Sequence, residues 1–271
     1  MAKIIGLVNQ KGGVAKTTTA SALAFGLAEE HGKRILLIDF DPQGNLTEST
    51  GIDVENWKSK KDESGKEKKM ETFYWLMRDV PFNDVVLNVP GTKVDILPTG
   101  IILAGAEKEL NSERVPHSKL RKAIDKIEKD YDYIIIDSSP NLANLTINVL
   151  CAVQEVIVPF KPEPLSLQIL ESLIDTVNEI KKEQMNSSLI IRGFLPTICR
   201  SNTISTKEVI EIFKRAAEEE GTKVYNAKIR QSVDASDAPA NAHSLFAYKK
   251  NSKVAQDYRF FIQEFLKEEK K

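Results

Sequence analysis

The chain has 271 residues, of which 41% are hydrophobic, and its formal net charge is −1. This length and apolar content suffice for one large α/β core, because single domains of about 200–250 residues are ordinary for that class. No apolar run approaches the ~18 residues that a membrane-spanning helix needs, and the first predicted strand begins too early for a signal peptide to precede it. We therefore expect one cytoplasmic domain, residues 1–271, whose net charge does not mark it as a nucleic-acid binder.

Apolar runs alternate with segments of helical periodicity along the chain. The predicted strands lie near residues 3–8, 34–38, 93–97, 132–137, 155–160, 189–196 and 223–229. Such alternation is typical of a doubly wound α/β fold, in which a mostly parallel, twisted sheet is flanked by helices. In this fold class, ligands bind at the carboxyl ends of the strands.

The segment after the first predicted strand is suited to holding phosphate. Residues 9–18 read Asn-Gln-Lys-Gly-Gly-Val-Ala-Lys-Thr-Thr, and a helix is predicted from Thr17 to Leu27. A strand, a glycine turn and a helix N-terminus place backbone N–H groups and the positive end of the helix dipole around one anion. In such a loop Lys16 contacts the β- and γ-phosphates of a nucleotide, and the Thr17 hydroxyl binds Mg²⁺.

The strict phosphate-loop pattern G-x-x-x-x-G-K-[ST] is not met, because Gln10 and Ala15 stand where the pattern has glycine. The alternative interpretation is a tight turn at Gly12 and Gly13 that binds nothing. The context favours a phosphate loop, since the turn follows a strand, opens a helix and keeps Lys16 in register.

Residues 11–18, Lys-Gly-Gly-Val-Ala-Lys-Thr-Thr, resemble the deviant Walker A box of the ParA/MinD ATPases. The resemblance implies that Lys11 contacts the nucleotide of a partner subunit, so that ATP closes a homodimer, and that Lys11 and Lys16 are catalytic. Most relatives carry glycine in place of Ala15. The nucleotide-binding residues that the resemblance implies are Lys11, Gly12, Gly13, Val14, Ala15, Lys16, Thr17 and Thr18.

Residues 34–47, Arg-Ile-Leu-Leu-Ile-Asp-Phe-Asp-Pro-Gln-Gly-Asn-Leu-Thr, resemble the second strand and first switch of ParA proteins in particular. Asp39 and Asp41 are two residues apart, which places both on one side of the strand's carboxyl end. The resemblance implies that Asp41 orients or polarises the attacking water and that Asp39 supports the Mg²⁺ shell. A solvated pair of aspartates at the start of a loop is the alternative.

A third apolar run, residues 131–137, ends in Asp137 and is predicted to be a strand buried on both faces. Asp137 matches the Walker B aspartate that holds Mg²⁺ in this family. The residues that follow, Ser138-Ser139-Pro140, depart in detail from the second switch of ParA relatives. The likeness covers roughly residues 1–50 and 93–250.

The resemblance implies a slow ATPase that uses ATP and Mg²⁺ and acts as a switch in plasmid or chromosome partition. The ATP-bound homodimer is expected to bind DNA non-specifically, which associates it with the nucleoid, and a ParB-type centromere-binding partner is expected to stimulate hydrolysis and release. The alternative is a MinD-like, membrane-recruited positioning ATPase. An iron-protein reductase of the same superfamily is disfavoured, because Cys151 and Cys199 do not supply its paired cluster cysteines.

Two further segments have two interpretations each. Residues 53–70 form a lysine-rich insertion, either a solvated loop or a basic contact for DNA or a partner. A C-terminal helix is predicted near residues 253–268, because Tyr258, Phe261, Ile262 and Phe265 follow helical spacing. MinD-like relatives bind membrane through such a tail. Acidic residues on its polar face favour packing on the domain core here, so no membrane partner is expected.

DNA contacts are the least defined part of the site. ParA relatives usually carry DNA-binding arginines in a segment resembling residues 229–239, but Gln231 and Asp234 occupy positions where arginines are common. We expect other cations to replace them, with scattered solubilising charges as the alternative. The candidate DNA-binding residues are Arg200, Lys228, Arg230, Lys249 and Lys250.

Overall fold

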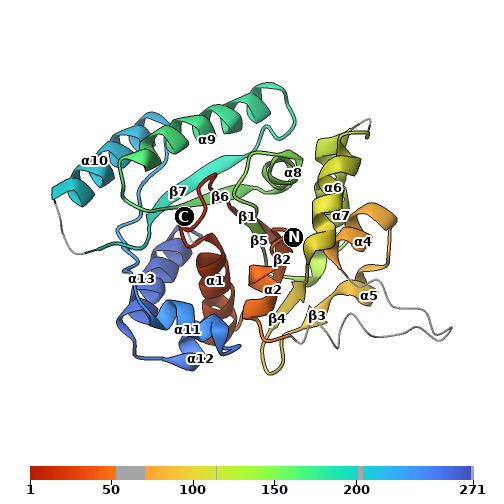
Figure 1. Ribbon diagram of the computed structural model, residues 1–271, viewed down its shortest axis with the longest axis horizontal. Coiled ribbons are helices and arrows are strands. Elements are labelled where there is room, and N and C mark those ends of the chain that lie inside the picture. Colours follow the sequence, from red (N-terminus) through yellow and green to blue (C-terminus); the bar gives the residue numbers. More distant parts are fainter. Residues whose placement is uncertain (53–70, 114, 201–203, 270–271) are drawn as a thin grey trace.

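The computed structural model describes residues 1–52, 71–113, 115–200 and 204–269, so the predicted insertion at 53–70 lies outside the described residues. Within these residues, seven strands form one sheet in the order β3-β4-β2-β5-β1-β6-β7 (Figure 1). The strands are β1 (Lys3–Leu7), β2 (Ile35–Phe40), β3 (Leu87–Asn88), β4 (Val94–Leu97), β5 (Tyr133–Ser138), β6 (Glu155–Phe160) and β7 (Ile190–Pro196).

Every strand pairing except that between β3 and β4 is parallel. The predicted doubly wound, mostly parallel sheet is therefore confirmed. The central strand β1 pairs with β5 on one side and with β6 on the other. The strand order reverses beside β1, and ligands of open α/β sheets bind outside the carboxyl ends of the strands at such a switch point.

Helices cover both faces of the sheet (Figure 1). Short 3₁₀ helices lie at Ile101–Leu103, Pro116–Ser118 and Glu128–Asp130. The α-helices are α1 (Lys16–His31), α2 (Asn45–Ser49), α4 (Thr72–Arg78), α5 (Phe82–Val85), α6 (Ala104–Leu110), α7 (Lys119–Ile124), α8 (Asn144–Ala152), α9 (Leu165–Lys182), α10 (Ile204–Glu219), α11 (Asp234–Ala240), α12 (Leu245–Tyr248) and α13 (Lys253–Glu268).

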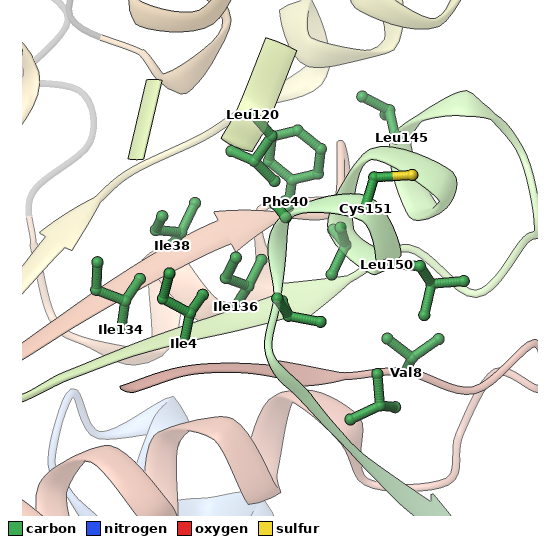
Figure 2. Close-up of a cluster of buried hydrophobic side chains, with 14 of the residues drawn as sticks. Ile4, Val8, Ile38, Phe40, Leu120, Ile134, Ile136, Leu145, Leu150 and Cys151 are labelled. Atoms are coloured by element: carbon green, nitrogen blue, oxygen red, sulfur yellow. The ribbon is translucent and has the colours of Figure 1, made fainter. Parts of the chain in front are cut away.

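The strands are buried on both faces, and their side chains alternate between two cores. Ile35 and Leu37 of β2 pack with α1, α12 and α13, whereas Ile38 and Phe40 pack with the helices of the opposite layer. Figure 2 shows part of this second core, where Ile4, Ile38, Ile134 and Ile136 of neighbouring strands lie close together. A period of two, with both classes apolar, is the pattern of a parallel sheet covered on both sides.

The C-terminal helix α13 packs tightly against α1. A Cβ at Gly26 of α1 would lie 2.3 Å from Ile262 Cδ1 and 3.0 Å from the Phe246 ring, so a larger residue there would force these side chains to shift. The apolar stripe predicted for this helix is buried at Tyr258, Phe261 and Phe265, as expected for packing on the core. Among the described residues, no helix is long and apolar enough to cross a membrane.

The predicted strand at 223–229 is wrong. This segment makes only isolated bridges, from Val224 to Phe194 and from Arg230 to Cys199. Between them, the backbone N–H groups of Asn226 and Ala227 donate to the Glu264 carboxylate of α13, at 3.2 and 2.8 Å. A side chain therefore accepts the bonds that a neighbouring strand would otherwise accept, and the ladder is interrupted. The short antiparallel strand β3 was not predicted, because two residues are too few to show a period.

Candidate nucleotide site

The loop between β1 and α1 is held by bonds to neighbouring strands. Asn9 lies at its start and is buried; its amide donates to Pro159 O of β6 at 2.7 Å, and its Oδ1 accepts from Lys11 N at 2.8 Å. Further along, Val14 O accepts a bond of 2.9 Å from the buried hydroxyl of Thr197, which follows β7. The loop geometry is therefore fixed by long-range contacts as well as by its own glycines.

Ala15, which replaces a glycine of the strict motif, adopts a left-handed backbone with φ 62° and ψ 34°. Gly13 has φ 69°, where glycine carries no steric penalty. An alanine in this region costs roughly 1–2 kcal/mol, because its Cβ approaches the following carbonyl. The motif's geometry is thus retained at Ala15 at the expense of local strain, and α1 begins directly afterwards at Lys16.

A cleft of about 1120 Å³ opens at this edge of the sheet. Its volume slightly exceeds the ~300–1,000 Å³ common for small-molecule sites. One wall consists of the phosphate loop and the start of α1, and Asp41 and Gln43 of the loop after β2 also line it. The opposite wall comes from the segment 229–240, including Arg230 and Gln231. Sequence reasoning linked that segment to DNA and missed its place in the cleft.

Lys16 is buried at the base of the cleft, with Nζ 3.3 Å from Lys11 O. Burial lowers the pKa of Lys16, while the negative charges of Asp137 and Asp41 oppose that shift. The ammonium group thus lies within electrostatic reach of both carboxylates. A phosphate placed over the loop would give this cation a further partner.

Thr17 and Asp137 meet at the end of β5, where the Thr17 hydroxyl donates to Asp137 Oδ2 at 2.6 Å. Asp137 is 1% exposed, and its Oδ1 has no hydrogen-bond partner among the described residues. Burial, followed by the nearby Asp39 charge, raises the pKa of Asp137 well above its usual range. A hydroxyl, a carboxylate and an unsatisfied buried oxygen fit a hard divalent cation such as Mg²⁺.

The structure separates the two aspartates that the sequence placed on one side of a strand. Because β2 ends at Phe40, the strand alternation stops before Asp41, which lines the cleft. Asp39 is fully buried beneath the loop and accepts bonds from the N–H and hydroxyl of Thr47, at 2.8 and 2.6 Å. Burial raises the pKa of Asp39 to about 6. Its oxygens hold the loop by accepting from Thr47 and from Asp41 N, so the contacts of Asp39 are with this loop.

Lys11 forms an ion pair within the chain that the sequence did not indicate. Its Nζ lies 2.9 Å from Glu163 Oε2, in the loop between β6 and α9, and Lys161 pairs with the same carboxylate. Glu163 is 152 positions away in sequence, and no local pattern indicates the pairing. Lys11 is therefore held beside the phosphate loop by a half-exposed carboxylate.

The candidate DNA-binding cations fall into two groups. The bridge between Cys199 and Arg230 brings Arg200, Lys228 and Arg230 together, whereas Lys249 and Lys250 follow α12. Most of them have partners: Arg200 Nε donates to Gln231 Oε1 at 2.8 Å, Arg230 pairs with Asp257 at 2.6 Å, and Lys249 pairs with Asp234 at 2.7 Å. The two acidic partners, Asp257 and Asp234, reduce the positive field that Arg230 and Lys249 alone would produce.

The fold and this site together define a class of protein. A glycine turn joins the central strand of a mostly parallel sheet to a helix, with a lysine and a threonine at the helix start. Asp137 lies at the end of β5, which pairs with β1, and Asp39 lies on β2, the next strand along the sheet. That is the arrangement of P-loop nucleoside triphosphatases.

Comparison with known proteins identifies the family. A family model described as "AAA domain" matches residues 2–191. The sporulation initiation inhibitor protein Soj of Bacillus subtilis (strain 168) is 37% identical over 261 residues, covering 95% of this chain and 96% of that protein. The chromosome-partitioning ATPase Soj of Treponema pallidum (strain Nichols) is 32% identical over 266 residues, covering 98% of both chains.

A solved structure of cobyrinic acid a,c-diamide synthase from Mycobacterium smegmatis, with bound ATP analog and magnesium, has a TM-score of 0.81 and 30% identity, covering 100% of this chain and 96% of that chain. The chain belongs to the AAA-domain family of P-loop ATPases and, within it, to the ParA/Soj-type partition ATPases.

Proposed function

We propose that this ATPase is an ATP-dependent dimerising switch in plasmid or chromosome partition. In its ATP state the dimer binds DNA without sequence preference, and a ParB-type partner stimulates hydrolysis and release. The observation that carries the proposal is the convergence of Lys16, Thr17 and Asp41 at one cleft, with the buried Asp137 bonded to Thr17. The names of the Soj relatives support the partition role.

The chain's residues divide the work at the cleft. The N–H groups at the start of α1 and the Lys16 ammonium bind and orient the triphosphate. Thr17 and Asp137 would hold Mg²⁺, which supplies charge neutralisation to the phosphates when it is bound. Asp41, on the cleft wall, orients the attacking water, because positioning and electrostatic stabilisation account for most of phosphoryl-transfer catalysis.

Lys11 couples nucleotide binding to dimerisation in this proposal. It lies beside the loop and pairs with Glu163, and that ion pair is partly exposed, with side-chain exposures of 22% and 38%. Ion pairs of this exposure contribute about 1 kcal/mol or less, so a partner's phosphate can displace the carboxylate. We do not extend the proposal to a membrane-recruited ATPase, because α13 buries the apolar stripe that membrane binding needs.

The test uses fluorescent-ATP binding and phosphate release. Lys16→Ala should lose nucleotide binding, whereas Asp41→Ala should bind ATP and hydrolyse it at least tenfold more slowly. In the Asp41→Ala background, sedimentation with ATP should show a dimer that binds DNA. Adding Lys11→Ala should leave ATP bound to a monomer with weakened DNA binding. Equal dimer fractions with and without Lys11→Ala would refute the coupling.

A further inference from the structure

One buried carboxylate closes the loop that carries Asp41. Asp39 lies in β2, at the start of this loop, and Thr47 lies in α2, at its end; both side chains are fully buried. Asp39 Oδ2 accepts from Thr47 N at 2.8 Å and from Thr47 Oγ1 at 2.6 Å. Its other oxygen, Oδ1, accepts from Asp41 N at 3.3 Å. The entry and the exit of the loop are therefore tied to the same side chain.

The Thr47 hydroxyl also ties this loop to β4. It donates to Asp39 and accepts from the backbone N–H of Thr99, just after β4, at 3.0 Å. Gly44, in the same loop, comes so close that a Cβ there would lie 3.1 Å from Thr99 O. A buried group that both donates and accepts at one small atom must be a hydroxyl, and apolar residues of the same shape offer neither bond.

We infer that Thr47 is a positioning residue for ATP hydrolysis, acting through Asp39 and the loop to aim Asp41 into the cleft. The inference rests on the role proposed for Asp41. Nucleotide binding should depend little on Thr47, because the phosphate loop is held by other contacts, from Asn9 to Pro159 and from Thr197 to Val14. Thr47 should thus affect kcat without affecting affinity.

The experiment compares Thr47→Val, which keeps the shape and removes the hydroxyl, with Thr47→Ser, which keeps the hydroxyl. Thr47→Val should lower kcat about tenfold to a hundredfold, with KM for ATP within about twofold, because small misplacements of a catalytic group cost up to about 10² in rate. Thr47→Ser should stay within about threefold of the wild-type kcat, on the same reasoning.

Thr50→Val is the matched control. Thr50 follows α2 and is 5% exposed, and its hydroxyl donates to Thr47 O at 2.7 Å with no bond to Asp39. The Thr50→Val substitution removes one hydrogen bond of a buried threonine hydroxyl from the same turn, and it should leave kcat unchanged. Thermal unfolding of all three variants separates loss of folding from loss of positioning.

A second readout needs no activity. In nucleotide-free protein, amide hydrogen exchange at Asp41 and Thr47 should be at least about tenfold faster in Thr47→Val than in the wild type. A hydrogen-bonded amide exchanges only when its segment opens locally, so a less firmly held loop exchanges faster. Exchange in Thr47→Ser and Thr50→Val should match the wild type. Unchanged exchange and unchanged kcat in Thr47→Val would overturn the inference.

A double mutant decides whether Thr47 acts through Asp41. If it does, adding Thr47→Val to Asp41→Ala should slow the residual hydrolysis no further. If Thr47→Val lowers the hydrolysis rate by the same factor in the wild-type and the Asp41→Ala backgrounds, the inference is overturned. Failure of the proposed function is distinct: Asp41→Ala would then hydrolyse ATP at the wild-type rate, and the exchange measurement would still decide whether Thr47 holds the loop.

Discussion

Arg192 fixes the end of α13 to the sheet, and removing it should destabilise the whole domain. It lies on β7 with a side chain that is 5% exposed. Its guanidinium pairs with Glu155 of β6 and, at 2.6 Å, with Glu269 just after α13, and it donates to Phe265 O at 2.8 Å. The guanidinium carbon also sits 4.0 Å from the centre of the Phe265 ring.

Arg192→Met keeps most of the apolar volume but removes one of the two cations that pair with the buried Glu155 carboxylate, leaving the partly exposed Lys3 at 2.8 Å. Breaking one side of a buried ion pair costs about 3–5 kcal/mol. A domain near this size loses about 2–4 °C in Tm for each kcal/mol, so Tm should fall by roughly 6 to 20 °C. The network lies at the amino ends of the strands, away from the phosphate loop, so ATP binding at low temperature should persist.

Urea unfolding and calorimetry measure this loss, and Arg78→Met is the matched control. Arg78 makes a bidentate pair with Glu109 at 2.7 Å, but the two side chains are 46% and 39% exposed. That exposed pair should contribute little to stability, and salt should weaken it further. The difference in the free energy of unfolding between Arg192→Met and the wild type should change little in about 0.5 M salt, because buried pairs are screened much less than exposed ones. Equal losses in the two variants would refute the reasoning.

Two smaller predictions concern the nucleotide site. Ala15→Gly should relieve the left-handed backbone strain and raise the free energy of unfolding by about 0.5–1 kcal/mol, measured by urea unfolding; a loss of stability would contradict the strain argument. Asp137→Asn removes a buried charge that faces Asp39. It should raise the Tm measured in EDTA without nucleotide while abolishing Mg²⁺-dependent phosphate release; an unchanged Tm together with full activity would remove Asp137 from the proposed metal site.

The sequence by itself determined the fold class and the phosphate loop. Apolar runs of the right length and a glycine turn before a helix are local patterns, and local patterns survive in a single sequence. The period-two burial of β2 and the start of α1 at Lys16 follow from residues that lie close together in the chain. The membership of Asp137 in the site also follows, because parallel strands end at the same edge of a sheet.

Only the tertiary structure decided which of these side chains meet, and how. Glu163 reaches Lys11, Thr197 holds the phosphate loop, and Glu264 interrupts the segment predicted as a seventh strand. Each contact joins residues far apart in sequence, or replaces a backbone partner with a side chain. Neither kind of contact produces a periodic pattern of residue types that could be recognised in the sequence.

Asp39 and Asp41, at the carboxyl end of β2, show the same limit for residues that are close in sequence. Their spacing predicted a shared side, but the strand ends at Phe40, so Asp39 turns into the core and Asp41 lies on the cleft. Where a strand stops depends on which buried groups need hydrogen-bond partners, here the Asp39 carboxylate and Thr47 with Thr99 behind it. Which buried groups need hydrogen-bond partners depends on how the interior packs, and the local pattern of residues does not show it.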